Sequence, residues 1–254
     1  MLRAFAVLTG VVACLTVVQP VGAGVNGSGH GSKASKAGAC REYGSAREGR
    51  YTVRDDYWRG HVCVTARRSG FTVTRAKFPA NPSPTYAFPN IFTGCEWGVC
   101  TPSSGLPARV SKLRKPQVTV RTSGNPVGGW SAAAEMWFSK HRMVNGQANQ
   151  AELMVWLRAR WYHASHVVVR LGGVRYYVAH WIANHGTGVT WNYIQFRLVR
   201  PVAGVTGLKL EPFIRYSERH GWIKPGSWLD NIEAGFELRA GGRGLAVTRF
   251  AARP

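Results

Sequence analysis

The segment ELMVWL at Glu152–Leu157 decides the fold class of this 254-residue chain. Successive side chains of a β-strand point to opposite faces of the sheet. One face of this segment would carry Glu152, Met154 and Trp156, and the other would carry only aliphatic residues. A strand with one aliphatic face and one face of carboxylate and aromatic side chains indicates a sheet that covers a core on one side only.

Short β-rich runs of the same kind recur along the chain, separated by Gly, Pro and Asn. They are Tyr51–Val53, Cys63–Thr65, Phe71–Ala76, Val118–Thr122, Ala132–Phe138, His166–Val169, Val174–Ile182, Val189–Phe196, Ile232–Leu238 and Leu245–Phe250. This density of short strands predicts an all-β sandwich or barrel. The segment Val205–His220 differs, because its apolar residues are spaced more as in a helix and Gly221 follows them. It predicts one short helix packed on the sheet.

The N-terminal region has the features of a secretory signal peptide at residues 1–23. Arg3 precedes an apolar run, and small residues end the segment. A membrane anchor is the alternative, but Pro20 and the following polar residues disfavour it. A lipoprotein signal at Cys14 is disfavoured because the apolar run continues beyond that cysteine. Residues 24–39 are rich in Gly, Ser and Lys and predict a flexible leader, which leaves 40–254 as one domain without a further membrane-spanning run.

Four cysteines remain after the predicted signal peptide is removed: Cys40, Cys63, Cys95 and Cys100. An even number in an oxidising compartment predicts two disulfides. Three connectivities are possible, and pairing of sequence neighbours favours Cys40–Cys63 with Cys95–Cys100. A zinc site is the competing interpretation, but neither CxxC nor paired-histidine spacing supports it, so we expect no metal.

The chain is strongly basic, with a formal net charge of +21. Such a charge is typical of proteins that bind nucleic acid or anionic surfaces. Here the arginines are scattered, the longest run is Arg67–Arg68, and no nucleic-acid-binding motif accompanies them. We therefore expect no nucleic-acid partner and no cofactor, and we expect a solvated basic surface that could attract anionic polysaccharide.

Twelve carboxylates allow a complete census of acidic groups. The ones inside strand-like runs are Glu135, Glu152, Glu233 and Glu237. Alternation places each of them opposite a core face, and Trp137 shares the face of Glu135. Aromatic rings stack on sugars, and two carboxylates about 5–5.5 Å apart serve a retaining glycosidase, whereas about 6.5–9.5 Å serves an inverting one. The competing interpretation is that these glutamates simply face solvent, and alternation alone does not decide between the two.

The chain resembles glycoside hydrolase family 12, the compact jelly-roll endoglucanases, and most of all its secreted actinobacterial members. The resemblance covers about Cys40–Phe250. The residues that carry it are Tyr51–Val53 with Trp58, Phe88–Phe92 leading into Gly94–Gly98, Glu152–Leu157, Ala234–Glu237 and Gly244–Val247. It implies a β-jelly-roll sandwich of two antiparallel sheets with a concave substrate cleft.

The resemblance also implies a retaining mechanism with Glu152 as nucleophile and Glu237 as acid/base. Glu135 matches an Asp that usually supports the nucleophile. Substrate-binding side chains are expected at Trp58, Trp97, Met154, Trp156 and Trp137. The mechanism requires a raised pKa at Glu237 and a low one at Glu152. The disulfide pairing that the family implies agrees with the pairing of sequence neighbours.

Several residues depart from the family pattern. Glu135 replaces Asp, Glu96 stands where many relatives have His, and Leu238–Arg239 replaces Pro and an aromatic residue. Arg158–Arg170 is basic and lacks an expected Gly/Pro-rich segment over the cleft. The leading hypothesis is a secreted, monomeric endo-β-1,4-glucanase that acts on a β-glucan. The alternatives are a polysaccharide-binding protein of the same fold with weak catalysis, and a basic protein held at cell walls by charge.

Overall fold

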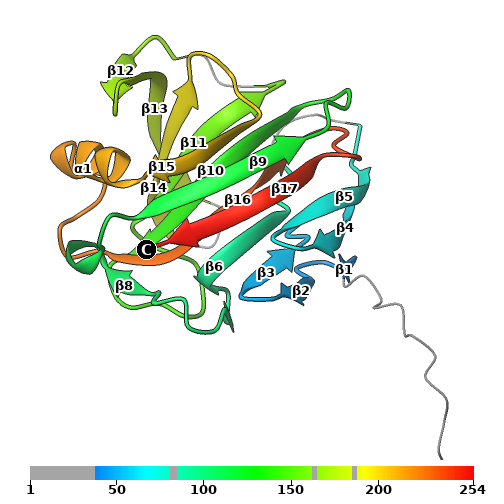
Figure 1. Cartoon of the computed structure of the whole chain (residues 1–254), viewed down its shortest axis with the longest axis horizontal. Helices are drawn as coiled ribbons and strands as arrows, with labels where there is room; N and C mark the ends of the chain where they lie inside the picture. Colours follow the sequence, from blue (N-terminus) through cyan, green and yellow to red (C-terminus); the bar gives the residue numbers. More distant parts are fainter. Residues whose placement is uncertain (1–37, 81–84, 162–164, 185–187) are drawn as a thin grey trace, which may run out of the picture. The chain divides into compact units, whose positions relative to one another are not determined.

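The computed structural model describes residues 38–80, 85–161, 165–184 and 188–254 (Figure 1). They belong to one compact unit, Ser35–Pro254. The predicted signal peptide and nearly all of the predicted leader lie outside the described residues. Gly38 and Ala39 form a strand, so regular structure begins before the predicted domain boundary at Cys40. Within the described ranges, no helix is long and apolar enough to span a bilayer.

The described residues form two sheets. The first has six strands in the order β1-β4-β5-β17-β9-β15. Their bounds are β1 Gly38–Ala39, β4 His61–Arg67, β5 Gly70–Lys77, β17 Ala246–Arg253, β9 Gln117–Ser123 and β15 Gly204–Lys209. These strands lie across the front of the molecule in Figure 1.

The second sheet has eleven strands. Nine follow the order β12-β13-β14-β11-β10-β16-β6-β3-β2, while β7 pairs with β6 and β8 pairs with β16. Their bounds are β12 Val168–Leu171, β13 Val174–Asn184, β14 Thr190–Leu198, β11 Ala151–Ala159, β10 Trp130–Ser139, β16 Trp228–Leu238, β6 Asn90–Glu96, β3 Tyr51–Arg54, β2 Ser45–Glu48, β7 Val99–Cys100 and β8 Ala108–Arg109.

The apolar core lies between the two sheets. Leu153, Val155 and Leu157 of β11 are fully buried in it, as the alternation in Glu152–Leu157 predicts. Val120 of β9 enters the same core from the six-stranded sheet. Burying each such side chain contributes about 1.5–3 kcal/mol, so this layer holds the sandwich together and orients the opposite faces of its strands outward. The predicted all-β sandwich is confirmed.

One strand pair departs from the expected antiparallel arrangement. β11 and β14 run parallel, with Glu152 beside Tyr193, whereas every other strand pair in the described residues is antiparallel. Parallel neighbours need a long crossover connection. Here the connection contains the β12–β13 hairpin, and β13 then pairs with the far side of β14.

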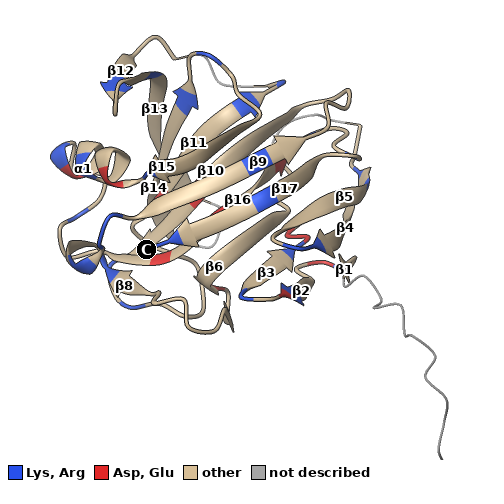
Figure 2. Cartoon of the chain, viewed as in Figure 1, with Lys and Arg blue, Asp and Glu red and all other residues tan. Residues whose placement is uncertain are grey.

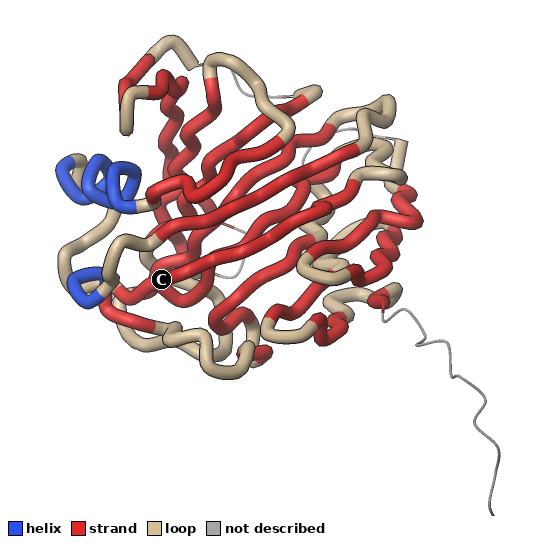
Figure 3. Tube along the Cα trace, in the orientation of Figure 1, coloured by secondary structure: helices blue, strands red, loops and turns tan. Residues whose placement is uncertain are grey.

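The predicted helix is shorter than Val205–His220. The structure has α1 at Glu211–Arg219, drawn blue in Figure 3, and a 3₁₀ turn at Val110–Lys112. The first part of the predicted helix is strand β15, because Val205 and Leu208 pair with apolar residues of β9 across a bulge. Tertiary pairing overrides the helix-like spacing there. Gly221, with a φ of 72°, follows the end of the helix as predicted.

Both predicted disulfides are present. Cys40–Cys63 ties the N-terminal strand β1 region to β4, and Cys95–Cys100 closes the hairpin of β6 and β7. His61 lies near the first pair, but the two sulfur atoms are bonded to each other. They therefore do not offer the thiolates that a zinc site requires.

Candidate active site

The eleven-stranded sheet brings together the four glutamates that strand alternation selected: Glu135, Glu152, Glu233 and Glu237. β10 lies between β11 and β16, which supply the other three. The four side chains lie on the face of the sheet that points away from the core between the sheets. A second, smaller apolar cluster, separate from that core, contains Met154, Trp156 and Tyr193. The carboxylates therefore share one outer face and surround an apolar floor, as a sugar site requires.

Glu152 is held by a tryptophan that the sequence did not point to. The Nε1–H group of Trp191 on β14 donates a hydrogen bond of 2.8 Å to Oε2 of Glu152. Burial raises the pKa of Glu152 to about 8; the Trp191 hydrogen bond lowers it, and the nearby Glu237 raises it further. The expectation of a low pKa at Glu152 is therefore wrong, because burial beside another carboxylate outweighs one indole donor.

Glu237 has a different set of partners. Ser131 lies opposite it on β10 and donates a hydrogen bond of 3.1 Å to its Oε2. Burial raises the pKa of Glu237 to about 7, against the lowering effects of Ser131, the Arg239 guanidinium and a hydrogen bond with Tyr193. The expected raised pKa is confirmed, and it keeps a proton available for transfer near neutral pH.

Glu135 and Glu233 form a buried carboxylate pair. They lie directly opposite each other on β10 and β16, and they are 2% and 1% exposed. Burial and their mutual repulsion raise the pKa of Glu135 well above its ordinary value, and Glu152 adds to this effect. No hydrogen bond joins Glu135 to Glu152 in the described part of the chain, so the supporting role of Glu135 stays a prediction.

An ion pair lies beside this carboxylate pair. The Arg54 guanidinium on β3 lies 3.0 Å from Oε1 of Glu96, and both side chains are almost fully buried. Burial raises the pKa of Glu96 to about 7, and Arg54 acts against that rise. Arg54 also acts electrostatically on Glu233. Sequence reasoning missed Arg54, since nothing local shows that β3 and β6 are neighbours.

The predicted sugar-binding side chains fall into two groups. Met154 and Trp156 are 1% and 0% exposed, so they form the floor of the site and offer no free ring or thioether surface. The Tyr193 hydroxyl oxygen lies 2.9 Å from Sδ of Met154 and helps to fix it. This burial differs from the direct substrate contact that we expected for both.

The other predicted aromatic residues keep accessible surface. Trp137 is half-buried against Trp191, with ring centroids 5.6 Å apart. Trp58 and Trp97 are 36% and 49% exposed, and Trp97 occupies the turn between β6 and β7. Trp181 on β13, which the sequence did not single out, stacks on Tyr193 at 4.1 Å and is 36% exposed. These rings offer flat apolar surface for stacking on sugars.

Known proteins are similar to this chain in sequence and in architecture. The family model described as glycosyl hydrolase family 12 matches residues 49–253. A metagenome-derived endoglucanase of that family, known by crystal structure, is 36% identical, with 85% of this chain and 96% of that chain covered and a TM-score of 0.76. Endoglucanase Cel12A from Rhodothermus marinus is 32% identical, with 85% and 97% covered and a TM-score of 0.76.

A curated relative agrees with these structures. Endoglucanase S from Pectobacterium parmentieri is 24% identical over 181 residues, which cover 68% of this chain and 67% of that protein. The family match includes β10, β11 and β16, the strands that supply the four glutamates. The resemblance predicted from the short sequence anchors is thereby confirmed over most of the chain, and this chain belongs to glycosyl hydrolase family 12 as a glycoside hydrolase of the cellulase type.

Proposed function

We propose that this protein is a secreted endo-β-1,4-glucanase that hydrolyses cellulose-like, mixed-linkage or xyloglucan polysaccharides with retention of configuration. The supporting observation is the shared outer face of Glu152 and Glu237, which interact electrostatically across β10. A retaining site needs one carboxylate that attacks the anomeric carbon and one carboxylic acid that protonates the leaving oxygen. Glu152 and Glu237 take these two roles.

In the first step, a Glu152 carboxylate oxygen forms a bond to the anomeric carbon as the glycosidic C–O bond breaks. Glu237 gives its proton to the departing oxygen, which leaves as a hydroxyl group on the shortened chain. Trp191 donates to Oε2 of Glu152 and so holds the carboxylate in place during attack. Orientation of this kind supplies a large share of the barrier reduction.

In the second step, Glu237, now ionised, takes a proton from water. The water oxygen attacks the anomeric carbon and displaces Glu152 as a carboxylate. The sugar is released with its original β configuration, and Glu237 is again protonated. A pKa near 7 suits both halves of this exchange, because the group must give and then take a proton at similar pH.

The raised pKa of Glu152 fits this scheme if the two carboxyl groups share one proton. The charge of Glu237 raises the pKa of Glu152, so a proton shared between the two carboxyl groups accounts for part of that rise. Positive charge develops on the anomeric carbon in the transition state. That charge stabilises an ionised Glu152, and it leaves the shared proton on Glu237 for the leaving oxygen.

The test is to monitor, by proton NMR, which anomer forms first when the protein hydrolyses a soluble mixed-linkage glucan. We expect the β anomer to appear first, with mutarotation to the α anomer later. First appearance of the α anomer would exclude the retaining scheme. A panel of carboxymethyl cellulose, mixed-linkage glucan and xyloglucan, assayed for new reducing ends, identifies the preferred substrate.

Chemical rescue separates the roles of the two carboxyl groups. Glu237→Ala with added azide should recover turnover and form a β-glycosyl azide, because the azide anion replaces water as the attacking group on the glycosyl-enzyme and needs no general base. The matched variant Glu48→Gln changes a glutamate at the edge strand β2 and should leave activity unchanged. An α-glycosyl azide from Glu237→Ala, together with a β-glycosyl azide from Glu152→Ala, would reverse the assignment.

One observation favours a second function, a polysaccharide-binding protein with weak catalysis. Glu135, one methylene longer than the usual Asp, makes no hydrogen bond to Glu152 in the described residues and instead faces Glu233. Under this alternative, wild type and Glu152→Gln would bind glucan equally and neither would release reducing ends. Turnover that depends on Glu152 rules it out.

Export and oligomeric state belong to the same proposal. Two disulfides support an oxidising compartment, and the predicted signal peptide supplies the route. N-terminal sequencing of protein from the culture medium should begin near residue 24, and light scattering should give the mass of a monomer. Retention of the protein in the cytoplasm, or a stable dimer, would contradict these points.

A further inference from the structure

The six-stranded sheet carries cations and no carboxylate. None of its strands contains Asp or Glu. Its charged side chains, all exposed, are Arg67, Arg75, Lys77, Arg121, Lys209, Arg249 and Arg253. We call this outward surface the basic face. Figure 2 shows Lys and Arg in blue on β9 and β17, which are neighbouring strands.

The cations of the basic face are arranged in rows by strand register. Arg121 on β9 lies directly opposite Arg249 on β17, which places their Cβ atoms about 5 Å apart. Four pairs further along the strands, Arg253 lies opposite Gln117, whose other neighbour is Lys209 on β15. Four residues of strand separate the two rows by about 13 Å.

This arrangement costs stability in the free protein. Like charges directly opposite each other on neighbouring strands repel. Arg121 and Arg249 have no ion-pair partner among the described residues, where the carboxylate ion pairs involve Arg54 and Arg215. A protein gains nothing for its fold from such a pair. An anion bound from outside would remove the repulsion, and the strands around this pair carry no carboxylate that would repel such an anion.

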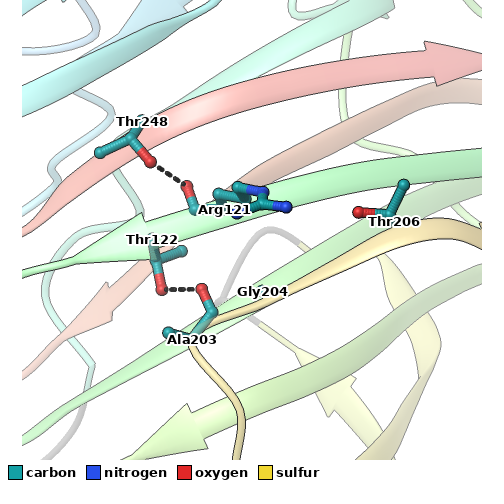
Figure 4. A pocket seen from close by; sticks show the side chains of 6 residues that line it. All are labelled: Arg121, Thr122, Ala203, Gly204, Thr206 and Thr248. Carbon is teal, nitrogen blue, oxygen red and sulfur yellow. Dashed lines mark hydrogen bonds between the residues drawn. The ribbon is translucent and has the colours of Figure 1, made fainter.

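A hollow of about 330 Å³ lies on the basic face, beside Arg121 (Figure 4). Thr122, Thr206 and Thr248 line it together with the small residues Ala203 and Gly204. The hydroxyl groups of Thr122 and Thr248 donate to the backbone oxygens of Ala203 and Arg121, which fixes these side chains. The hollow combines one guanidinium group with hydroxyl groups. Because Ala203 and Gly204 are small, a ligand can approach the backbone there.

The side chains of the basic face select the chemical class of partner. Arginine forms paired hydrogen bonds with a planar carboxylate. The hydroxyl oxygens of the exposed Thr206 and Thr248 accept hydrogen bonds from sugar hydroxyl groups, whereas Thr122 is buried. The exposed large apolar and aromatic residues of the described chain all lie outside these six strands. A membrane would need such apolar groups for insertion, and a single-stranded nucleic acid would stack its bases on such rings.

We propose that the basic face binds an acidic polysaccharide of the polyuronate class, through rows of arginine and lysine that meet the carboxylates of an extended chain. The surface belongs to a different sheet from the glutamates that act on β-glucan. The enzyme would thus hold a charged wall polymer on one sheet while it cleaves a neutral polymer on the other. This inference stands apart from the cleavage chemistry and does not depend on its outcome.

The experiment uses the full mature protein and sodium polygalacturonate as the probe. Affinity is measured by titration calorimetry at several salt concentrations between about 20 and 300 mM. We expect Arg121→Gln/Arg249→Gln/Arg253→Gln to weaken binding about tenfold or more at low salt, since each exposed charge pair is worth about two- to fivefold. The salt dependence of the remaining binding should also be shallower.

A matched control comes from the other sheet. Arg170 and Arg175 lie opposite each other on β12 and β13, and both are exposed. Arg170→Gln/Arg175→Gln, set beside Arg121→Gln/Arg249→Gln, removes the same charge from the same kind of pair. The control should change polygalacturonate affinity less than twofold, while both double variants keep wild-type activity on soluble mixed-linkage glucan. Arg121→Gln/Arg249→Gln should also raise the melting temperature.

Other outcomes overturn the proposal. Equal weakening by the two double variants would show that only net charge attracts the polymer. Equal affinity for fully methyl-esterified polygalacturonate would show that the carboxylates are not recognised. Tighter binding to duplex DNA or to phosphatidylserine vesicles, lost in the same Arg121→Gln/Arg249→Gln variant, would assign the face to a different partner.

Discussion

The two sheets bury similar aliphatic faces against each other, yet their outer faces differ in the carboxylates that they carry. The eleven-stranded sheet carries Glu135, Glu152, Glu233 and Glu237 with aromatic residues around them. The six-stranded sheet carries arginine, lysine and threonine and no acidic residue. Both sheets carry arginines, so the difference lies in the carboxylates, which the strands of the six-stranded sheet lack.

Glu152→Gln should have the largest effect, and it tests whether hydrolysis depends on the eleven-stranded sheet alone. Removing the attacking oxygen should lower kcat about 10⁴-fold or more, because the amide is not a nucleophile. Binding of polygalacturonate to the other sheet should stay at the wild-type level. Reducing-end assays and calorimetry on one preparation give both values, and activity within about tenfold of wild type would remove Glu152 from the reaction.

A second variant tests the role of Glu135 on the acidic face, which is the outer face of the eleven-stranded sheet with Glu135, Glu152, Glu233 and Glu237. Glu135→Asp shortens the side chain that lies beside Met154 and Glu233, and it restores the residue usual at this position. If Glu135 positions Glu152, kcat should rise about tenfold at nearly constant KM, since small displacements of a catalytic group have large effects on rate. A lower kcat, with the circular dichroism spectrum unchanged, would mean that the longer side chain is needed.

The acidic face should also make stability depend on pH. The pKa of Glu152 is about 8 and that of Glu237 about 7 when folded, against about 4.3 when unfolded. The folded state therefore binds more protons between these values, so the free energy of unfolding falls as the pH rises from about 4.5 to about 8. The basic face contains no carboxylate and contributes nothing to this trend.

The buried pair of Glu135 and Glu233 also has raised pKa values, and Glu233→Gln tests its share of this pH dependence. It removes one member of the buried pair and should raise the free energy of unfolding at pH 8 by about 1–3 kcal/mol, with little change at pH 4.5. Urea denaturation at both pH values measures the difference. Glu48→Gln, on the edge strand β2, serves as the control and should leave the pH dependence as it is in wild type. An equal effect of both variants would contradict the assignment to the buried pair.

The smallest expected effect concerns Arg239, a cation next to the acid/base. Arg239 lowers the pKa of Glu237 and lies over the Trp161 ring, 3.0 Å from its centroid. Arg239→Leu should raise the pKa of Glu237 and extend activity to higher pH, by less than about one pH unit. The exposed Arg160 offers the control Arg160→Leu. A shift to lower pH would mean that Arg239 acts on another group.

Local sequence patterns predicted the parts of this site that lie within single strands. Period-two alternation placed Glu152 opposite the core side chains Leu153 and Val155, and the structure agrees. The same rule brought Glu135 and Glu237 to one face. These predictions succeed because the direction of a side chain in a strand depends only on its place in the pleat.

Contacts between distant strands could not be predicted in the same way. Trp191 reaches Glu152 only because β14 lies parallel to β11, and that pairing leaves no mark in either segment. The low pKa expected for Glu152 failed for a similar reason, since its burial involves other strands, including Trp137 on β10 and Trp191 on β14. Val205 was misassigned to a helix because its strand partner, Val120, is still more distant in sequence.

The parallel pairing of β11 with β14 has a consequence for how the molecule assembles. Antiparallel hairpins such as β12–β13 form over short loops. The parallel pairing of β14 with β11 requires closure of a longer connection, so we expect it to form later. Trp191 and Tyr193 both arrive on that late strand. During refolding, recovery of hydrolysis should thus lag behind recovery of β-sheet content.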